Sequence, residues 1–180
     1  MKQAYEAKAW GFVPDYMRKD ILYQYGGIYL DTDVEMLKCP DELLYQDGFC
    51  GIENGRLGIQ INMGLGFGAR KGLPLIKELR DVYSDEEFHL FERNRMKIGP
   101  DYETEVLKRH GFQANNEYQI VANMTVYPIE VLSGTRFYSG RSFVTKNTYF
   151  VHHYASSWND KKYSQDKEDV KQLYKIFKCI

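Results

Sequence analysis

The spacing of hydrophobic positions changes along the chain and predicts helices that alternate with short strands. Residues 14–25 carry an apolar stripe at helical spacing, and the glycine pair at 26–27 ends it. The next three residues, 28–30, are apolar and predict a short buried strand that runs directly into two aspartates. Strands that alternate with helices favour an α/β layer fold.

The remaining elements follow from the same periodicities and from turn residues. Further helices are expected at 2–10, 73–82, 102–108 and 164–180. Further strands or extended segments are expected at 34–37, 49–53, 118–121, 124–127 and 149–153. Between residues 51 and 72, seven glycines predict loop or closely approached backbone. The length suits one domain, 1–180, that ends in the amphipathic helix 164–180.

Composition places the chain among ordinary soluble globular proteins, with 43% hydrophobic and 27% charged residues. A formal net charge of −1 provides no global field for a polyanion, so nucleic acid is disfavoured as a partner. The three cysteines are far apart, without zinc spacing, and indicate a reducing compartment. The sequence shows no signal peptide and no long apolar segment. The cytoplasm is therefore the expected location.

Asp31 and Asp33 follow the predicted strand and form an Asp-x-Asp pattern. In a regular strand, such residues point to the same side of the sheet, about 6.5 Å apart. At that spacing both cannot hold one ion equally unless the strand bends, so one is expected to ligate a metal while the other acts through water or holds the ribose. Isolated Asp-x-Asp patterns are common on protein surfaces. A buried strand that leads into this one favours a ligand site, at the strand end where α/β sheets bind ligands.

Asp15 and Arg18 are one helical turn apart in the predicted helix 14–25. The commoner interpretation of such a pair is an exposed ion pair that contributes little to stability. The helix leads into the strand before Asp31, so the pair is also expected close to the two acids. There the planar guanidinium of Arg18 would be available to hydroxyls or phosphate.

Two adjacent histidines, His152 and His153, lie in the last predicted strand. Neighbours on a strand face opposite sides, so only one of the two can enter a site with the acids. A structural or surface role is the commoner interpretation of such a pair. An imidazole together with carboxylates suits Mn²⁺ better than Mg²⁺, which prefers oxygen ligands.

Together these residues resemble a known family. Residues 15–18, 21–23 and 26–34 resemble the signature of glycosyltransferases that contain a DXD motif. The family includes bacterial capsular polysaccharide transferases and yeast initiating mannosyltransferases, with the large clostridial glucosylating toxins as distant relatives. Weaker matches follow in order, at Gly51-Ile52-Glu53, Ile61-Asn62, Gly68, Lys71-Gly72, Ile98-Gly99-Pro100, His152-His153 and Ser157-Trp158.

The resemblance implies a GT-A-like, Rossmann-like fold and a retaining hexosyl transfer from a UDP- or GDP-sugar to a polysaccharide or glycolipid. It implies that Asp15 and Arg18 hold hydroxyls of the donor sugar, and that Asp31 contacts ribose and sugar. The implied catalytic set is Asp31, Asp33, Asp15 and Arg18. The implied ligands of Mn²⁺ or Mg²⁺ are Asp33, Asp31 and one histidine, His153 in preference to His152. Further substrate contacts are expected at Tyr29, Asn62, Ser157 and Trp158.

Two other classes of function fit parts of the pattern. A non-catalytic or degenerate sugar-nucleotide-binding fragment would keep the donor site without turnover. A metal-dependent phosphohydrolase would need more clustered acids and histidines than the sequence offers. Detection of sugar transfer or donor hydrolysis separates a transferase from the non-catalytic alternative.

The resemblance also predicts something about each end of the chain. Relatives carry an earlier stretch before residues 2–10, with the first strand of the nucleotide-binding sheet. We therefore expect an N-terminally incomplete catalytic domain in which the strand at 28–30 lacks a neighbour. In the helix 164–180, a lysine stripe is most often a solvated face, and the alternative is peripheral contact with the inner face of a membrane.

Overall fold

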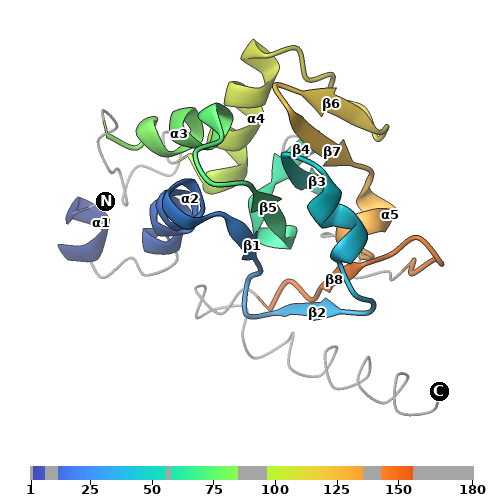
Figure 1. Ribbon diagram of the computed structural model, residues 1–180. Helices are drawn as coiled ribbons and strands as arrows, with labels where there is room; N and C mark the ends of the chain where they lie inside the picture. Colours follow the sequence, from blue (N-terminus) through green and yellow to red (C-terminus); the bar gives the residue numbers. More distant parts are fainter. Residues whose placement is uncertain (1, 7–11, 56–57, 85–96, 136–142, 156–180) are drawn as a thin grey trace.

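A six-stranded mixed β-sheet with helices packed against it forms the centre of the structure, a computed structural model (Figure 1). The structure describes residues 2–6, 12–55, 58–84, 97–135 and 143–155. Over these residues the alternation of helices and strands confirms the predicted α/β class. No helix in the described ranges is long and apolar enough to cross a membrane.

The elements agree in type with most of those predicted. The described helices are α1 (Lys2–Glu6), α2 (Val13–Tyr25), α3 (Pro74–Asp81), α4 (Gly99–Arg109) and α5 (Ile129–Leu132). Two 3₁₀ turns are η1 (Asp41–Tyr45) and η2 (Met63–Leu65). The described strands are β1 (Gly27–Tyr29), β2 (Val34–Met36), β3 (Gly48–Gly55), β4 (Gly58–Asn62), β5 (Phe67–Ala69), β6 (Gln119–Val121), β7 (Met124–Tyr127) and β8 (Phe150–His152). The predicted helix 164–180 lies outside the described residues.

β3 is the central strand of the main sheet, in which the strand order is β1-β5-β3-β7-β6. β4 pairs with the second half of β3, while β5 pairs with its start. The pair of β3 with β7 is parallel, with Phe49 opposite Thr125, and the other described pairs are antiparallel. Nearly every residue of β3 is buried, as expected for a strand covered on both faces.

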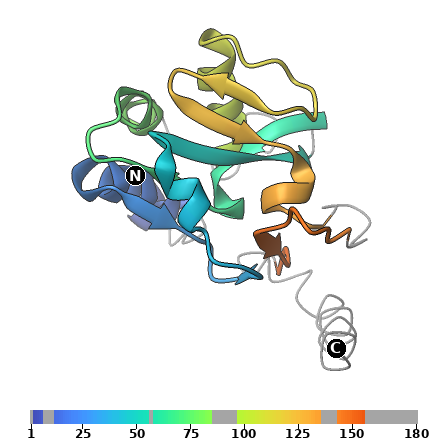
Figure 2. The same ribbon diagram turned by 45° about the vertical axis from the view of Figure 1, so that its right-hand side comes forward.

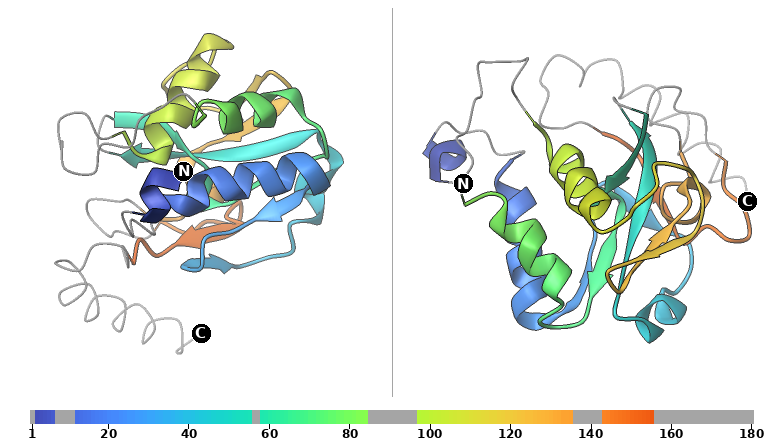
Figure 3. Two further views of the ribbon diagram at one scale, coloured as in Figure 1. Left: turned by 90° about the vertical axis from the view of Figure 1, so that its left-hand side faces the viewer. Right: turned by 90° about the horizontal axis from the view of Figure 1, so that it is seen from above.

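Each face of the main sheet has its own hydrophobic core. Helices α2, α3 and α4 cover one face, as the left view of Figure 3 shows, and α5 packs on the other. The alternation of side chains along β3 serves both faces, because Cys50 and Ile52 point into the helix-side core and Phe49 points into the other. The sheet is thereby fixed between two packed layers.

β2 and β8 form a separate two-stranded antiparallel sheet at one end of the main sheet (Figure 2). In this pair, Val34 lies opposite His152 and Met36 lies opposite Phe150. The pairing joins the residues that follow β1 to a segment from the far end of the described chain. It therefore decides which late residues reach Asp31 and Asp33.

The glycine-rich region 51–72 contains more regular structure than predicted, since it includes β4, η2 and β5. Its glycines are nevertheless places of close approach. A Cβ atom on Gly68 would lie 2.4 Å from the Phe49 ring. Gly66 has a backbone φ of 117°, which residues other than glycine rarely adopt. The glycines thus let strands pack tightly against aromatic rings.

β1 is an edge strand in the described sheet. It pairs with β5 alone, with Gly27 opposite Ala69, so its other edge carries no described strand. An edge strand leaves backbone donors and acceptors available for pairing. The expected additional strand at that edge stays a prediction.

Candidate functional site

Asp31 and Asp33 lie on a turn and not on the continuation of the strand that was predicted. β1 ends at Tyr29, and the Val34 amide donates to the Asp31 carbonyl oxygen over 3.1 Å, which closes the turn. The turn supplies the bend that a shared ion requires, because an extended chain would hold the two carboxylates further apart. One ligand atom of each aspartate and one of His152 all lie within 4.8 Å of one another.

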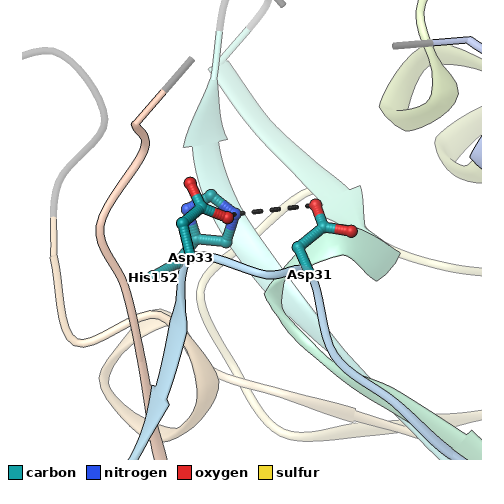
Figure 4. A group of neighbouring side chains, drawn as sticks. All are labelled: Asp31, Asp33 and His152. Carbon is teal, nitrogen blue, oxygen red and sulfur yellow. Dashed lines mark ion pairs between the residues drawn. The ribbon is translucent and has the colours of Figure 1, made fainter. Parts of the chain in front are cut away.

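His152 is the histidine that the structure brings to the two acids. Its Nε2 lies 3.4 Å from Asp33 Oδ1 and 3.8 Å from Asp31 Oδ2, and Figure 4 shows the three side chains facing one another. The cause is the register of β2 with β8, which places His152 opposite Val34 directly after the turn. The side chain is buried, with 8% of its surface exposed.

His153 lies beside a different acid, which reverses the preference between the two histidines drawn from the sequence. Its Nε2 is 3.0 Å from Glu35 Oε2, away from the carboxylates of Asp31 and Asp33. Its backbone still supports the site, because the His153 amide donates to the Asp33 carbonyl over 3.0 Å. The Ala155 amide donates to Asp33 Oδ2 over 2.8 Å, so this segment fixes the Asp33 side chain as well.

The proton of the His152 ring has a defined place in this arrangement. The Tyr154 amide donates to His152 Nδ1 over 3.0 Å, so Nδ1 acts as an acceptor. A neutral ring then carries its proton on Nε2, facing the two carboxylates. Nε2 can bind a metal only when that proton has left it. If the proton moved to Nδ1, the Tyr154 amide would lose its acceptor.

Arg18 and Tyr29 hold one oxygen of Asp31. Arg18 Nη1 lies 3.3 Å from Asp31 Oδ1, and the Tyr29 hydroxyl donates to the same oxygen over 2.7 Å. Burial raises the pKa of Tyr29 to about 12, and the adjacent Asp31 adds to the shift, so the hydroxyl keeps its proton and remains a donor. Oδ2 of Asp31 is left to face His152.

Asp31 is held in its ionised form. Burial alone would raise the pKa of Asp31, but the contacts with His152, Arg18 and Tyr29 outweigh it and hold the pKa below its usual range. A carboxylate binds a cation in the ionised form. Asp31 is therefore available as an anionic ligand.

Asp15 and Arg18 are buried, which excludes the exposed ion pair considered from the sequence. Only 8% of Asp15 and 5% of Arg18 is exposed, and Arg18 Nη2 donates to Asp15 Oδ1. Burial raises the pKa of Asp15 despite the neighbouring charges of Arg18 and Lys19. The pair thus lies beneath Asp31, in the layer between α2 and the site.

Lys19 and Glu103 were not predicted from the sequence to lie near the site, and both are fully buried. Lys19 Nζ donates to Glu103 Oε1 over 2.7 Å, next to the pair of Asp15 with Arg18. A signal was present in the predicted helix 102–108, where Glu103 is three residues before Val106 and four before Leu107. A charged residue on the apolar face of a helix indicates a buried partner.

Asn62 caps η2 beside the site. Its Oδ1 accepts from the Gly64 amide over 2.7 Å, and its Nδ2 donates to Glu53 Oε2 over 2.8 Å. Gly64 packs against Asp31, since a Cβ atom there would lie 2.6 Å from Asp31 Oδ2. Ser157 and Trp158, the other two substrate contacts expected late in the chain, lie outside the described residues.

The match with known proteins falls on the part of the chain that holds the two acids. Residues 1–50 match the family of glycosyltransferase sugar-binding regions that contain the DXD motif. The match spans 50 of the 180 residues and ends long before His152. Neither a curated protein nor a solved structure matches the chain.

The match to this type of region suggests glycosyl transfer with a sugar donor, and regions of this family typically bind a divalent metal. The mixed sheet with helices on its faces agrees with a GT-A-like glycosyltransferase fold. Outside the matched stretch, the fold adds His152 to the two aspartates.

Proposed function

We propose that this chain is a metal-dependent retaining glycosyltransferase that moves a hexose from a nucleotide-diphosphate sugar to a glycan or glycolipid acceptor. The supporting observation is the convergence of Asp31 and Asp33 with His152, which lies outside the matched region. The retaining outcome, the UDP or GDP nucleotide and the type of acceptor rest on the resemblance of the sequence to DXD-containing glycosyltransferases.

The donor set of the cluster fits a divalent cation, and Mn²⁺ best. Two carboxylates and one imidazole combine oxygen with nitrogen, which suits Mn²⁺ better than Mg²⁺. Ligands of one octahedral ion are separated by about 3 Å when adjacent and about 4 Å when opposite. The separations of 3.4 and 3.8 Å from His152 Nε2 to the two carboxylates lie between these two values, so small shifts would bring the three groups around one ion. We therefore propose Asp33, Asp31 and His152 as the ligands, with His152 in place of His153.

A bound Mn²⁺ would neutralise the negative charge that develops on the leaving diphosphate. The chain's own residues orient the groups around it. Arg18 and Tyr29 fix one oxygen of Asp31, and the Ala155 amide fixes one oxygen of Asp33. The second oxygen of each aspartate is thereby directed towards His152. Such preorganisation favours departure of a charged group without a strong base.

Asp15 and Arg18 act on the donor mainly through Asp31 in this proposal. Both Nη atoms of Arg18 already have carboxylate partners. The Arg18 Nε is buried, and no described residue accepts a hydrogen bond from it. A sugar hydroxyl that reached this nitrogen would satisfy it, which agrees with the role in sugar binding that the resemblance implies. Tyr29, Asn62, Ser157 and Trp158 remain the other proposed substrate contacts.

A thermal-shift screen tests the proposal. UDP-glucose, UDP-galactose and GDP-mannose are added singly with Mn²⁺, and the same series with EDTA serves as the control. At a donor concentration of 100 times Kd, binding adds about 2.7 kcal/mol to the free energy of unfolding. We expect one nucleotide series to raise the melting temperature only with Mn²⁺. Failure of every sugar nucleotide to do so would refute the proposed donor site.

A turnover assay separates the transferase from the non-catalytic alternative. The donor that stabilises the protein is incubated with Mn²⁺, and release of UDP or GDP is followed with and without a glycan acceptor. Release of nucleotide supports the transferase. Binding without any release would instead support a sugar-nucleotide-binding module.

Gly64→Ala is expected to weaken the binding of Mn²⁺ about tenfold, within the range seen when the groups around metal ligands are altered. The new Cβ would lie 2.6 Å from Asp31 Oδ2, while Arg18 and Tyr29 hold the other oxygen, so Oδ2 must move. The electron paramagnetic resonance signal of free Mn²⁺ during a titration measures the affinity. An affinity equal to that of the wild type would mean that the position of Oδ2 does not matter for the ion.

A further inference from the structure

Two neighbouring side chains of α4, Glu103 and Thr104, accept hydrogen bonds from backbone amides along the outer edge of β4 and just after it. β4 pairs with β3 through its other edge, and Thr104 Oγ1 accepts from the Ile61 amide over 2.9 Å. Glu103 Oε2 accepts from the Met63 amide over 2.8 Å, at the start of η2. Both contacts satisfy buried backbone donors, but only the second lies on the turn that approaches Asp31.

The other oxygen of Glu103 holds two cations of α2. Glu103 Oε1 accepts from Lys19 Nζ over 2.7 Å and from Arg18 Nη2 over 3.3 Å. The Glu103 side chain has no exposed surface. Inside the protein such charge-assisted hydrogen bonds are strong and directional, so they restrict where both cations can lie.

Both sets of contacts end at Asp31, one at each oxygen. The other terminal nitrogen of Arg18, Nη1, lies 3.3 Å from Asp31 Oδ1. The Met63 amide precedes Gly64, where an added Cβ atom would lie 2.6 Å from Asp31 Oδ2. The Asp31 carboxylate therefore lies between two groups that the same buried glutamate holds.

We infer that Glu103 is a positioning residue that sets the orientation of the Asp31 carboxylate from below, through Arg18 on one side and η2 on the other. The effect on Asp31 is a property of the fold, whereas its consequence for an ion rests on the proposed function. Thr104 provides the matched control, because it makes the neighbouring contact with β4 at Ile61, and its described hydrogen bonds reach neither Arg18 nor η2.

Nuclear magnetic resonance of the protein without added metal tests the inference directly. Glu103→Gln keeps the shape of the side chain, but the amide loses the charge and one of the two acceptors that Met63 and the cations share. We expect its changes in amide chemical shift to extend through Met63 and Gly64 to Asp31. Thr104→Val should change the amide chemical shifts around Ile61 and leave the amide chemical shift of Asp31 unchanged. Equal changes at Asp31 in both variants, or none in either, would overturn the inference.

A titration with Mn²⁺ alone tests the consequence for the ion. We expect Glu103→Gln to raise the Kd for Mn²⁺ about tenfold, the size of effect seen for residues that orient metal ligands. Thr104→Val should stay within twofold of the wild type, even though it also lowers the melting temperature. Similar Kd values for Glu103→Gln and the wild type would refute this part of the inference. Failure of the wild type to bind Mn²⁺ would refute the proposed metal site, while the chemical shifts still decide the role of Glu103.

A second variant covers the case in which Glu103→Gln does not fold. Glu103→Gln leaves Lys19 without its closest carboxylate, and an uncompensated buried charge is strongly destabilising. The double variant Lys19→Met with Glu103→Gln removes the cation together with the charge of its partner. It should fold and still show the change of shift at Asp31, because the amide at position 103 keeps only one acceptor oxygen and either Arg18 or the Met63 amide loses its partner. An unchanged Asp31 resonance in this variant would contradict the inference.

Discussion

Asp33→Asn is expected to abolish the binding of Mn²⁺, and of any donor that depends on it, while the protein stays folded. Loss of a residue that hydrogen-bonds to a metal ligand lowers the affinity for the metal about 10- to 100-fold. Replacement of a ligand itself should therefore lower that affinity at least about 100-fold. The neutral amide has nearly the shape of the carboxylate, and its oxygen can still accept from the Ala155 amide. We therefore expect the melting temperature without metal to change little. A Mn²⁺ titration followed by electron paramagnetic resonance measures the loss.

Asp47→Asn is the matched control for this substitution. Asp47 is an acid on the surface that pairs with Arg70 over 2.8 Å, and it takes no part in the cluster of Asp31, Asp33 and His152. Its amide variant should bind Mn²⁺ with the affinity of the wild type. If Asp33→Asn also kept that affinity, Asp33 would not be a metal ligand.

Lys19→Met is expected to lower the free energy of unfolding by about 3 kcal/mol, the lower end of the range for breaking a buried ion pair. Lys19 is fully buried, and its ammonium donates to Glu103 over 2.7 Å and to the Asp15 carbonyl over 3.0 Å. Among the described residues, the substitution leaves Glu103 with Arg18, at 3.3 Å, as its remaining cationic partner. Urea denaturation followed by circular dichroism measures the change.

Lys77→Met separates the effect of burial from the effect of removing a lysine. Lys77 pairs with Asp81 over 2.6 Å on α3, but about half of its side chain is exposed. An exposed pair of this kind contributes less than about 1 kcal/mol. If the two variants lost the same small amount of stability, the buried network would not contribute as proposed.

The local elements near the site could be predicted because their patterns are short and continuous. The stripe in residues 14–25 and the glycine pair after it predicted the helix that became α2. The apolar residues 28–30 predicted β1 to within one residue. The resemblance of residues 15–34 to DXD-containing glycosyltransferases agrees with the match over residues 1–50.

The choice between His152 and His153 could not be made in the same way. Alternation along a strand excludes one of the two but does not say which, because a shift of register by one residue exchanges the faces. The pairing of Val34 with His152 decides the choice, and it joins segments more than a hundred residues apart. The preference for His153 had no geometric basis in the sequence.

The sequence by itself determined the two acids, the helix before them and the α/β class, because each depends on periodicity within a few neighbouring residues. The tertiary structure alone decided which of these residues lie close together. The hydrogen bond that closes the turn from Asp31 to Val34 brings the two carboxylates close, and the register of β8 adds His152. Packing of α4 against α2 and η2 buries Glu103 between Lys19 and Met63. Contacts between distant segments depend on how whole faces pack, and no local pattern of residues specifies that.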